Sequence, residues 1–519
     1  MKVDRTKRAL INISVGLINK IFVTLLPFII RTIMIYSIGI EYLGLDSLFT
    51  SVLSMLSLSE LGFSSAVVYS MYKPIAEGDD GKVRGLLTFY KQVYRLVGII
   101  ILIAGLVLLP NIKWFIAEGT SYPQDINIYI VYLVFLVNTA VSYLLFGYKS
   151  SVLVATMRND LDSIIETVRS VISHGLQILV LVIFKDYYLY IIILPVITIL
   201  NNIIRSVIID KRYPQYKGNG KLTKADKRDI LTRVGALIGN KLGGAVFTSV
   251  DSIVISKFLG LVVLAQYTNY YTIFSAVFAI ETVVYTSFQS VVGNSLVVNS
   301  KEKNYFLFKD LFIINIILTT FCVCCFTSLY QPFISLWVGK ENVLGIEIPL
   351  LLALYFFVKS TRRTLFTFYE AAGMWKLDFF KPYVSVILNL VVNILLVQIV
   401  GLSGVIISSI LALIVVEMPW ETIVFFKKYF EKSLREYLWL IIKSVFLCGL
   451  CFVVSFFLSY FICGGVLGLI LRLIITLMVC AIPTIILIFF TSEGRQAFGR
   501  FGFFDKIKNN KLIRRRTFK

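Results

Sequence analysis

Long apolar segments follow one another through this sequence. Each is long enough for an α-helix to cross the hydrocarbon core of a membrane, which takes about 20 residues. The composition agrees, because 58% of the 519 residues are hydrophobic, only 16% are charged, and the mean hydropathy is +0.84. Such a chain is too apolar for a soluble protein. We therefore predict an all-α polytopic membrane protein with about 14 transmembrane helices.

The N-terminal segment MKVDRTKR lacks the small-residue cleavage site of a signal peptide, so we expect the first span to be retained. The predicted spans cover residues 10–36, 42–72, 88–110, 127–148, 161–184, 187–209, 230–257, 261–297, 306–330, 348–370, 380–399, 403–426, 437–461 and 465–490.

Basic residues are distributed unevenly between the two sides of the predicted bundle. Loops on the N-terminal side hold most of the Lys and Arg, and loops on the opposite side hold only Lys113, Lys185, Lys257 and Lys340. The positive-inside rule then places both termini in the cytoplasm. This asymmetry accounts for most of the net charge of +21, so we expect no nucleic-acid partner. The basic tail KIKNNKLIRRRTFK is instead expected to contact anionic lipids.

Charged residues interrupt the first two spans, where a membrane tolerates them least. Lys20 and Arg31 lie eleven residues apart, and at about 100° per residue they fall within roughly 20° of each other on one helix face. In the second span, Asp46 and Glu60 share a face with the hydroxyl side chains of Thr50, Ser57 and Ser64. A charge at the bilayer centre costs at least about 2.5 kcal/mol, so we predict that both stripes face a bundle interior or a polar cavity.

An internal repeat organises the chain. Asn19-Lys20 recurs as Asn240-Lys241, and Gly39 recurs as Gly260, both at an offset of 221 residues. We therefore predict two six-helix lobes of the same orientation, with Lys20 and Lys241 facing one another across a central cavity. The predicted parts are an N-terminal lobe (1–210), a basic cytoplasmic linker (211–228), a C-terminal lobe (229–428), an extra helix pair (429–490) and a basic cytoplasmic tail (491–519).

Nothing in the sequence is suited to enzyme chemistry. The loops are too short for a soluble catalytic domain, and the chain contains no phosphate-cradling glycine motif, nucleophile elbow or metal-ligand spacing. The seven cysteines all lie in apolar runs, where they are expected to pack as small buried side chains. We therefore expect no enzyme activity, no metal site and no cofactor.

Three stretches resemble a known family. The segment IGIEYLGLDSLFTSVLSMLSLSELGFSSAVVYSMYKPIAEGD resembles the signature of Wzx-type polysaccharide flippases, in the multidrug/oligosaccharidyl-lipid/polysaccharide exporter superfamily. TRRTLFTFYEAAGMWKLDFFKPYVSVILNLVVNILLVQIVGLSGVIIS is similar to the family's tenth to twelfth helices, and SVDSIVISKFLGLVVLAQY is similar to its seventh. The likeness covers roughly residues 5–430. It is broken at Tyr369, where members often carry Arg.

The resemblance implies a function, a location and partners. Such flippases move undecaprenyl-diphosphate-linked oligosaccharide repeat units, which build O-antigen, capsule or exopolysaccharide. They move them from the cytoplasmic to the outer leaflet of the bacterial inner membrane by alternating access between two six-helix lobes. A polysaccharide polymerase and a chain-length regulator are the implied protein partners.

A lipid-linked sugar of this kind carries a diphosphate of about two negative charges, so its carrier needs cations near mid-depth and a polar lumen. The candidate substrate-binding residues are Lys20, Arg31, Lys241, Arg362 and Arg363. Lys359 extends the last pair into a basic stripe on the tenth span. In the alternative interpretation, Arg363 and Glu370 lie near the cytoplasmic end and compensate each other.

Acidic residues inside or near the spans suggest coupling to protons or sodium, because buried carboxylates are the usual proton carriers. The candidates are Asp46, Glu60, Asp251 and Glu281. Asp251 is equally suited to neutralise Lys241. His174, the single histidine, is expected to be a packing residue. An intrahelical salt-bridge stripe is predicted for Asp162, Glu166 and Arg169.

Three other functions are compatible with parts of the pattern. A lipid II-type flippase would have the same fold. A multidrug exporter of the same superfamily would more often have twelve spans and an acidic cavity. A polysaccharide polymerase or ligase typically carries a large extracytoplasmic loop, whereas the outside loops predicted here are short.

Overall fold

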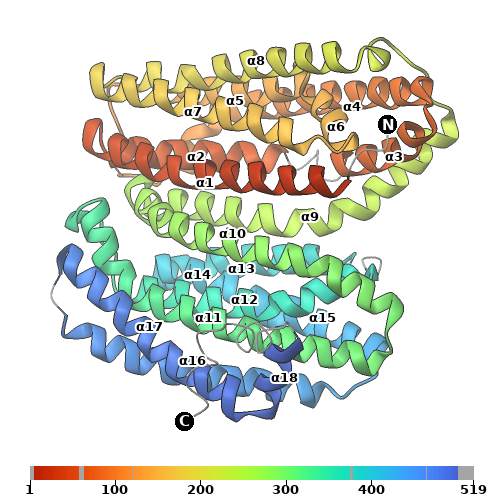
Figure 1. The fold of residues 1–519 in the computed structure, drawn as a ribbon. Coiled ribbons are helices and arrows are strands. Elements are labelled where there is room, and N and C mark those ends of the chain that lie inside the picture. The colour runs from red at the N-terminus through yellow and green to blue at the C-terminus, as the bar shows by residue number, and fades with distance from the viewer. Residues whose placement is uncertain are drawn as a thin grey trace. The chain divides into compact units, whose positions relative to one another are not determined.

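The computed structural model of the protein describes residues 5–57, 63–120, 122–374, 377, 379–462 and 464–500. Within these ranges, the side chains of residues 5–14, 17–18, 235–245, 490, 492–493 and 500 are not described. Every described element is helical, as predicted (Figure 1). The chain forms two compact units, called here unit 1 (residues 1–268) and unit 2 (residues 269–519).

Each predicted span falls on a helix or on a series of helices. The helices up to the unit boundary are α1 (Arg5–Ser37), α2 (Ile40–Leu56), α3 (Phe63–Glu77), α4 (Asp80–Leu108), α5 (Ile128–Leu144), α6 (Ser150–Ala155), α7 (Asn159–Ile183), α8 (Tyr187–Arg212) and α9 (Lys224–Leu259). The boundary lies inside α10 (Leu261–Val298). The later helices are α11 (Lys301–Trp337), α12 (Glu347–Ala371), α13 (Lys381–Val400), α14 (Leu402–Leu411), α15 (Met418–Phe425), α16 (Leu434–Tyr460), α17 (Gly465–Phe490) and α18 (Ser492–Arg500).

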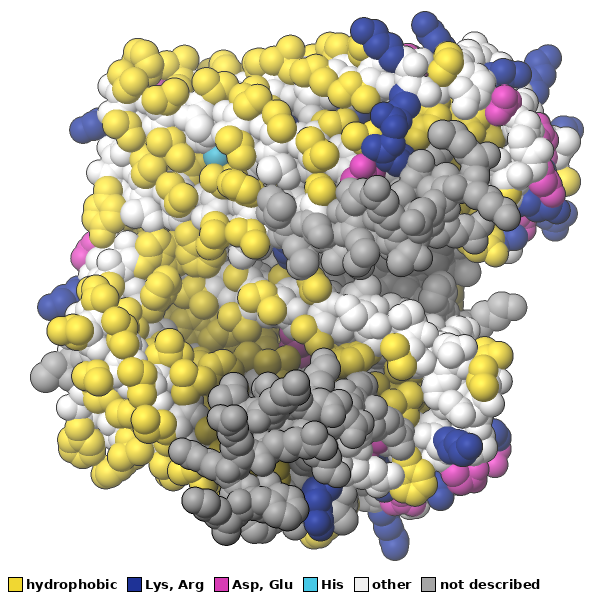
Figure 2. All heavy atoms as spheres, in the orientation of Figure 1, with side chains coloured by type: hydrophobic (Ala, Val, Ile, Leu, Met, Phe, Trp, Pro, Cys, Tyr) yellow, Lys and Arg dark blue, Asp and Glu magenta, His cyan; other side chains and the backbone are white. Residues whose placement is uncertain are grey.

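Ten helices in the described part of the chain are long and apolar enough to cross a membrane. An eleventh candidate is the pair Ile128–Leu144 and Gly147–Ala155, which is bent by 46°. Hydrophobic side chains cover much of the face of unit 1 seen in Figure 2, and Lys and Arg gather towards one end of it. These features are those of a multi-pass membrane protein.

One predicted span differs from the helices observed. In the span predicted at 42–72 the structure describes α2 and α3, and residues 58–62 between them lie outside the described residues. The span predicted at 403–426 contains a π-helical turn at Ala412–Glu417, and a second follows at Phe426–Phe430. π-turns insert a residue into the helical repeat and are frequent at functional sites.

Unit 1 is organised by helix pairs: α1 packs on α7, α2 on α9, and α5 on both α4 and α8. The repeated glycines Gly39 and Gly260 both precede a helix and both have positive φ, at 120° and 91°. Ser47 and Thr268, also 221 residues apart, lie 3.3 Å from each other through their hydroxyl oxygens. Equivalent positions of the sequence repeat therefore have equivalent local structure. The division into six-helix lobes stays a prediction.

Unit 2 is centred on α11, which packs on α12, α16 and α17. The second pair of closely packed helices is α13 and α14. Phe308 and Phe312 of α11 contact Tyr437 of α16, so the extra helix pair shares an aromatic core with the rest of unit 2.

The basic segment expected to be a linker is docked on α4. Arg84 donates to the Gln215 carbonyl at 3.0 Å, and the Gly220 amide donates to the Thr88 hydroxyl at 3.0 Å. A Cβ atom on Gly85 would lie 2.8 Å from the Lys221 carbonyl oxygen. The segment is therefore part of the folded unit 1, because only glycine allows this approach.

We predict that Gly44→Ala destabilises the protein by about 1–3 kcal/mol, because the added Cβ overpacks a helix contact. That Cβ would lie 2.3 Å from the Leu261 carbonyl oxygen. This oxygen is a backbone atom, so it cannot move aside as a flexible side chain could. Gly175→Ala is the matched control, since its Cβ meets no atom within 4 Å. Thermal unfolding of both variants in detergent measures the difference, and equal melting temperatures would contradict the packing described.

Candidate functional site

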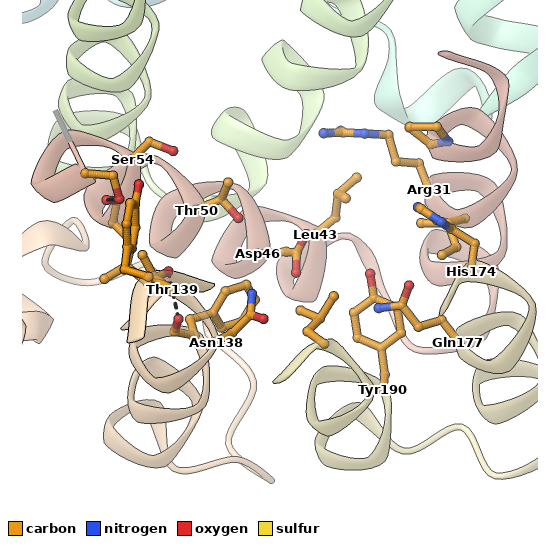
Figure 3. Close-up of a pocket in the computed structure, with 17 residues that line it drawn as sticks. Arg31, Leu43, Asp46, Thr50, Ser54, Asn138, Thr139, His174, Gln177 and Tyr190 are labelled. Carbon is orange, nitrogen blue, oxygen red and sulfur yellow. Dashed lines mark hydrogen bonds between the residues drawn. The ribbon is translucent and has the colours of Figure 1, made fainter. Parts of the chain in front are cut away.

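A polar cavity of about 540 Å³ lies inside unit 1, among α1, α2, α5, α7 and α8 (Figure 3). It occupies the half of the unit nearer to the turn between α1 and α2. Its lining residues include Arg31, Asp46, Thr50, Asn138, His174, Gln177 and Tyr190. Five helices thus direct polar side chains into one space within an apolar bundle, which is the arrangement predicted from the polar stripes of the first two spans.

Arg31 and Asp46 provide the charges of this cavity. The Arg31 guanidinium donates to the Thr268 hydroxyl at 3.1 Å and attracts the Asp46 carboxylate. Arg31 is therefore held at the cavity wall by α10 as well as by its own helix. The placement of both side chains agrees with the helix faces assigned from residue spacing in the sequence.

The remaining polar wall was not predicted. The Nδ1 atom of His174 lies 2.7 Å from the Ser170 carbonyl oxygen, and the imidazole ring lines the cavity. The side chain of Asn138 accepts a hydrogen bond from the Thr198 hydroxyl at 2.8 Å, which holds it in place. Gln177, on the same helix as His174, and Tyr190 of α8 are buried side chains. A sequence pattern on one helix cannot identify such residues, because the cavity is formed only when five helices pack.

The structure does not show a role for four predicted site residues. The side chain of Lys20 is exposed on unit 1. Glu60 and the side chain of Lys241 lie outside the described residues. Asp251 is buried, and its predicted pairing with Lys241 cannot be followed for the same reason.

Unit 2 contains a buried ion-pair cluster around Arg362. The guanidinium contacts Glu417 at 2.6 Å, and its Nε and Nη2 atoms donate to the two Glu421 oxygens at 2.7 and 2.5 Å. Lys381 donates to Glu421 at 2.5 Å, and Ser385 donates to Glu417 at 3.0 Å. Two cations and two carboxylates therefore neutralise one another, which satisfies groups that would be costly to bury alone.

The sequence did not single out Glu417, Glu421 or Lys381. Glu417 ends the first π-turn and Glu421 lies between the two turns, where the regular 3.6-residue spacing used to assign helix faces is interrupted. Arg362, predicted to bind substrate, is fully engaged in this cluster, so its role as a ligand stays a prediction.

Lys359 has a different environment. Its ammonium lies 4.5 Å from the ring centroid of Phe278, 5.2 Å from that of Tyr355 and 5.5 Å from that of Phe274. In the described residues, neither Lys359 nor Arg363 forms an ion pair with a carboxylate. Arg363 lies beside the rings of Tyr285 and Phe366, and its Nε atom is buried without a hydrogen-bond partner. Aromatic faces stabilise both cations without neutralising them.

Glu281 faces this stripe from α10. It is 3% exposed, and one carboxylate oxygen accepts from the Ser360 hydroxyl at 2.6 Å. The other oxygen, Oε2, has no hydrogen-bond partner among the described residues. Glu281 attracts both Arg363 and Lys359. A buried carboxylate with one unsatisfied oxygen is suited to take up a proton or a cation.

Two further sequence predictions concern α7 and the cysteines. Glu166 and Arg169 form an ion pair on α7, as predicted, and Arg205 of α8 joins them by contacts to Glu166 and Asp162 at 3.6 and 3.1 Å. The six described cysteines are unbonded thiols in the interior or partly buried. Within the described ranges, no group of three or more His, Cys, Asp or Glu is placed to hold a metal ion.

The sequence matches the family described as "Polysaccharide biosynthesis protein" over residues 9–292, which is more than half of the chain. No curated protein matches the sequence at a significant level.

Three solved structures share the fold. The lipid II flippase MurJ, in an inward closed conformation, aligns with a TM-score of 0.68 at 16% identity, over 92% of this chain and 99% of its own. A multidrug resistance MATE family transporter aligns in its inward-facing conformation (TM-score 0.55, 16% identity, 84% and 98% coverage). A MATE family transporter also aligns in its outward-facing conformation (0.51, 15%, 84% and 95%). These proteins are a flippase and transporters, and at this level of identity the likeness shows the fold.

We predict that Glu421→Gln destabilises unit 2 by about 3–5 kcal/mol, because it leaves Arg362 and Lys381 without full compensation in the interior. Asp229→Asn is the control, since Asp229 forms an exposed ion pair with Arg233 and such pairs contribute at most about 1 kcal/mol. Thermal unfolding in detergent compares the two. An unchanged melting temperature for Glu421→Gln would show that the cluster does not stabilise the fold.

Proposed function

This chain belongs to the polysaccharide biosynthesis protein family, as its sequence led us to expect, and we propose that it is a flippase for an oligosaccharide linked to undecaprenyl diphosphate. The proposed direction is from the cytoplasmic to the outer leaflet of a bacterial inner membrane, with both termini in the cytoplasm. The proposed partners are the anionic leaflet lipids, a polysaccharide polymerase and a chain-length regulator.

The observation that carries the proposal is the pair of cations on α12. Lys359 is the thirteenth of 25 residues in this helix, so it lies near the middle of the span, and Arg363 lies one turn further on. Both contact aromatic rings, and neither forms an ion pair with a carboxylate among the described residues. A diphosphate of about two negative charges would give each of them a direct ionic partner. Arg362 differs, because it is already paired with Glu417 and Glu421.

The cavity of unit 1 is suited to the sugar. Amide, hydroxyl and carboxylate groups from Asn138, Gln177, Tyr190 and Asp46 all line it. These groups donate to and accept from sugar hydroxyls, while Arg31 adds a positive charge. A lipid-linked glycan needs both kinds of site, one for its charge and one for its hydroxyl groups.

Coupling to protons is proposed for Glu281. The surrounding cluster contains equal numbers of basic and acidic side chains: Lys359, Arg362, Arg363 and Lys381 against Glu281, Glu370, Glu417 and Glu421. Protonation of Glu281 would leave one positive charge in excess, beside Lys359 and Arg363. Proton uptake and diphosphate binding would therefore favour each other by mutual coupling. Asp46 remains the second coupling candidate, in unit 1.

We predict that Lys359→Gln and Arg363→Gln each lower the rate of flipping by about tenfold or more, because each removes a charge-assisted contact to the diphosphate. The assay uses the purified protein in vesicles that contain a fluorescent undecaprenyl-diphosphate oligosaccharide. The signal is the loss of this fluorescent lipid from the inner leaflet of the vesicles. The control is Lys309→Gln, which also removes a lysine packed on aromatic rings but lies near the start of α11.

Lipid II is assayed in parallel in the same vesicles. Faster transport of lipid II than of the oligosaccharide lipid would replace the proposed substrate by the peptidoglycan precursor. Wild-type rates in both α12 variants would remove these cations from the substrate site.

We predict that Glu281→Gln abolishes the dependence of transport on pH, because the amide cannot release a proton. Wild-type flipping should rise as the pH falls, since protonation of Glu281 exposes the positive charge of α12. The measurement is the initial rate of flipping from about pH 5.5 to about pH 8.5, which covers the physiological range. The control is Glu436→Gln, at a carboxylate in the first turn of α16 that accepts a hydrogen bond from Tyr305. A pH profile retained in Glu281→Gln would exclude Glu281 from coupling.

A further inference from the structure

Unit 1 has a second cavity, of about 210 Å³, whose lining residues are all different from those of the polar cavity. Its walls come from the first turns of α4, from the bend between α5 and α6, from the last turn of α8, and from the docked segment after α8. The lining residues include Thr88, Lys91, Lys149, Asp210, Tyr213, Tyr216, Lys217 and Asn219. None of them belongs to the proposed substrate site.

The charges of this cavity do not balance. Lys149 is neutralised, because its ammonium donates to both Asp210 oxygens at 2.6 and 2.7 Å and to the Ser206 hydroxyl at 2.7 Å. Asp210 is the only acidic residue of the lining. Lys91 of α4 and Lys217 of the docked segment also line the cavity, and neither has an ion-pair or hydrogen-bond partner among the described residues. The cavity therefore keeps an excess of two positive charges in a partly enclosed space.

The walls are fixed in place. The docked segment is held to α4 by the hydrogen bonds of Arg84 and Thr88 described above. Tyr213 and Tyr216 stack on each other, with ring centroids 5.8 Å apart, and the Tyr213 hydroxyl bonds to Thr156 at 2.9 Å. Phe146, at the bend, has the left-handed backbone conformation (φ 57°) that non-glycine residues adopt at a cost. Two lysines on fixed walls form a preorganised site for one small anion.

The position of the cavity indicates the anion. α8 leaves the apolar region at Lys211 and Arg212, and two tyrosines follow, as is usual where a helix passes the headgroup layer. By the positive-inside rule, these basic residues mark this end of unit 1 as the cytoplasmic side. We propose that the cavity binds the phosphate group of an anionic lipid headgroup in that leaflet. The site is separate from the transported molecule, and the proposal does not depend on its identity.

The test is the thermal stability of the full-length protein in detergent, titrated with short-chain lipids. Dioctanoyl phosphatidylglycerol should raise the melting temperature in a saturable manner, because a ligand that binds only the folded state stabilises it. Dioctanoyl phosphatidylcholine, which has no net charge, should not. In Lys91→Gln/Lys217→Gln the half-saturating concentration should rise by about tenfold for each lysine removed.

The matched control is Lys211→Gln/Lys224→Gln, which removes the same charge from the same region outside the cavity. Its titration should match that of the wild type. Lys217→Gln alone provides a variant without risk to folding, because Lys217 is exposed on the docked segment.

Two results would overturn the proposal. An equal loss in the control double variant, or no loss in Lys91→Gln/Lys217→Gln, would mean that the lipid acts through general surface charge. A saturable response to inorganic phosphate that matches that of the anionic lipid would assign the cavity to a soluble phosphate compound and exclude the headgroup as its ligand.

Discussion

A charge buried in a membrane protein must be compensated, and this requirement explains most of the polar architecture of the chain. In unit 2 it is met by the contacts of Arg362 and Lys381 with Glu417 and Glu421. These four groups come from three segments of the chain, namely α12, α13 and the segment around α15. Their mutual attraction fixes how α12, α13 and the segment around α15 pack, since removal of any one group leaves another without a partner.

Against this background, the cations that lack carboxylate partners are informative. Lys359 and Arg363 lie within one turn of Arg362, yet they contact aromatic rings. Aromatic faces lower the cost of burial and leave the charge available to a ligand. The same distinction separates Lys149, which is neutralised by Asp210, from Lys91 and Lys217 in the second cavity. We therefore propose that the cations without carboxylate partners are the ones that bind ligands, a distinction that residue type alone does not reveal.

Much of the fold could be predicted from the sequence, because a membrane allows few backbone solutions. The apolar segments located the helices, and the polar stripes placed Arg31 and Asp46 on faces that line a common cavity. The stripe of Glu166 and Arg169 followed from helical spacing in the same way. These predictions succeed because they depend only on local periodicity.

The rest depends on tertiary structure. The π-turns before and after α15 interrupt an apolar run that looks continuous in sequence. Glu417 and Glu421 were missed for this reason. His174 bonds to Ser170 of its own helix, and its position on the cavity wall could not be predicted because four other helices complete that cavity. The docked segment after α8 looked like a free linker, since the glycine contact that fixes it joins residues that are far apart in sequence.

The most direct test of the flippase assignment is the sidedness of the lipid-linked oligosaccharide in cells depleted of this protein. A membrane-impermeant reagent that labels sugars is applied to right-side-out and inverted membrane vesicles. The assignment predicts that the lipid-linked glycan accumulates on the cytoplasmic face and returns to the outer face on re-expression. Accumulation of single-repeat glycan lipid on the outer face would contradict it, because translocation would then proceed without this protein and a polymerase or ligase role would take its place.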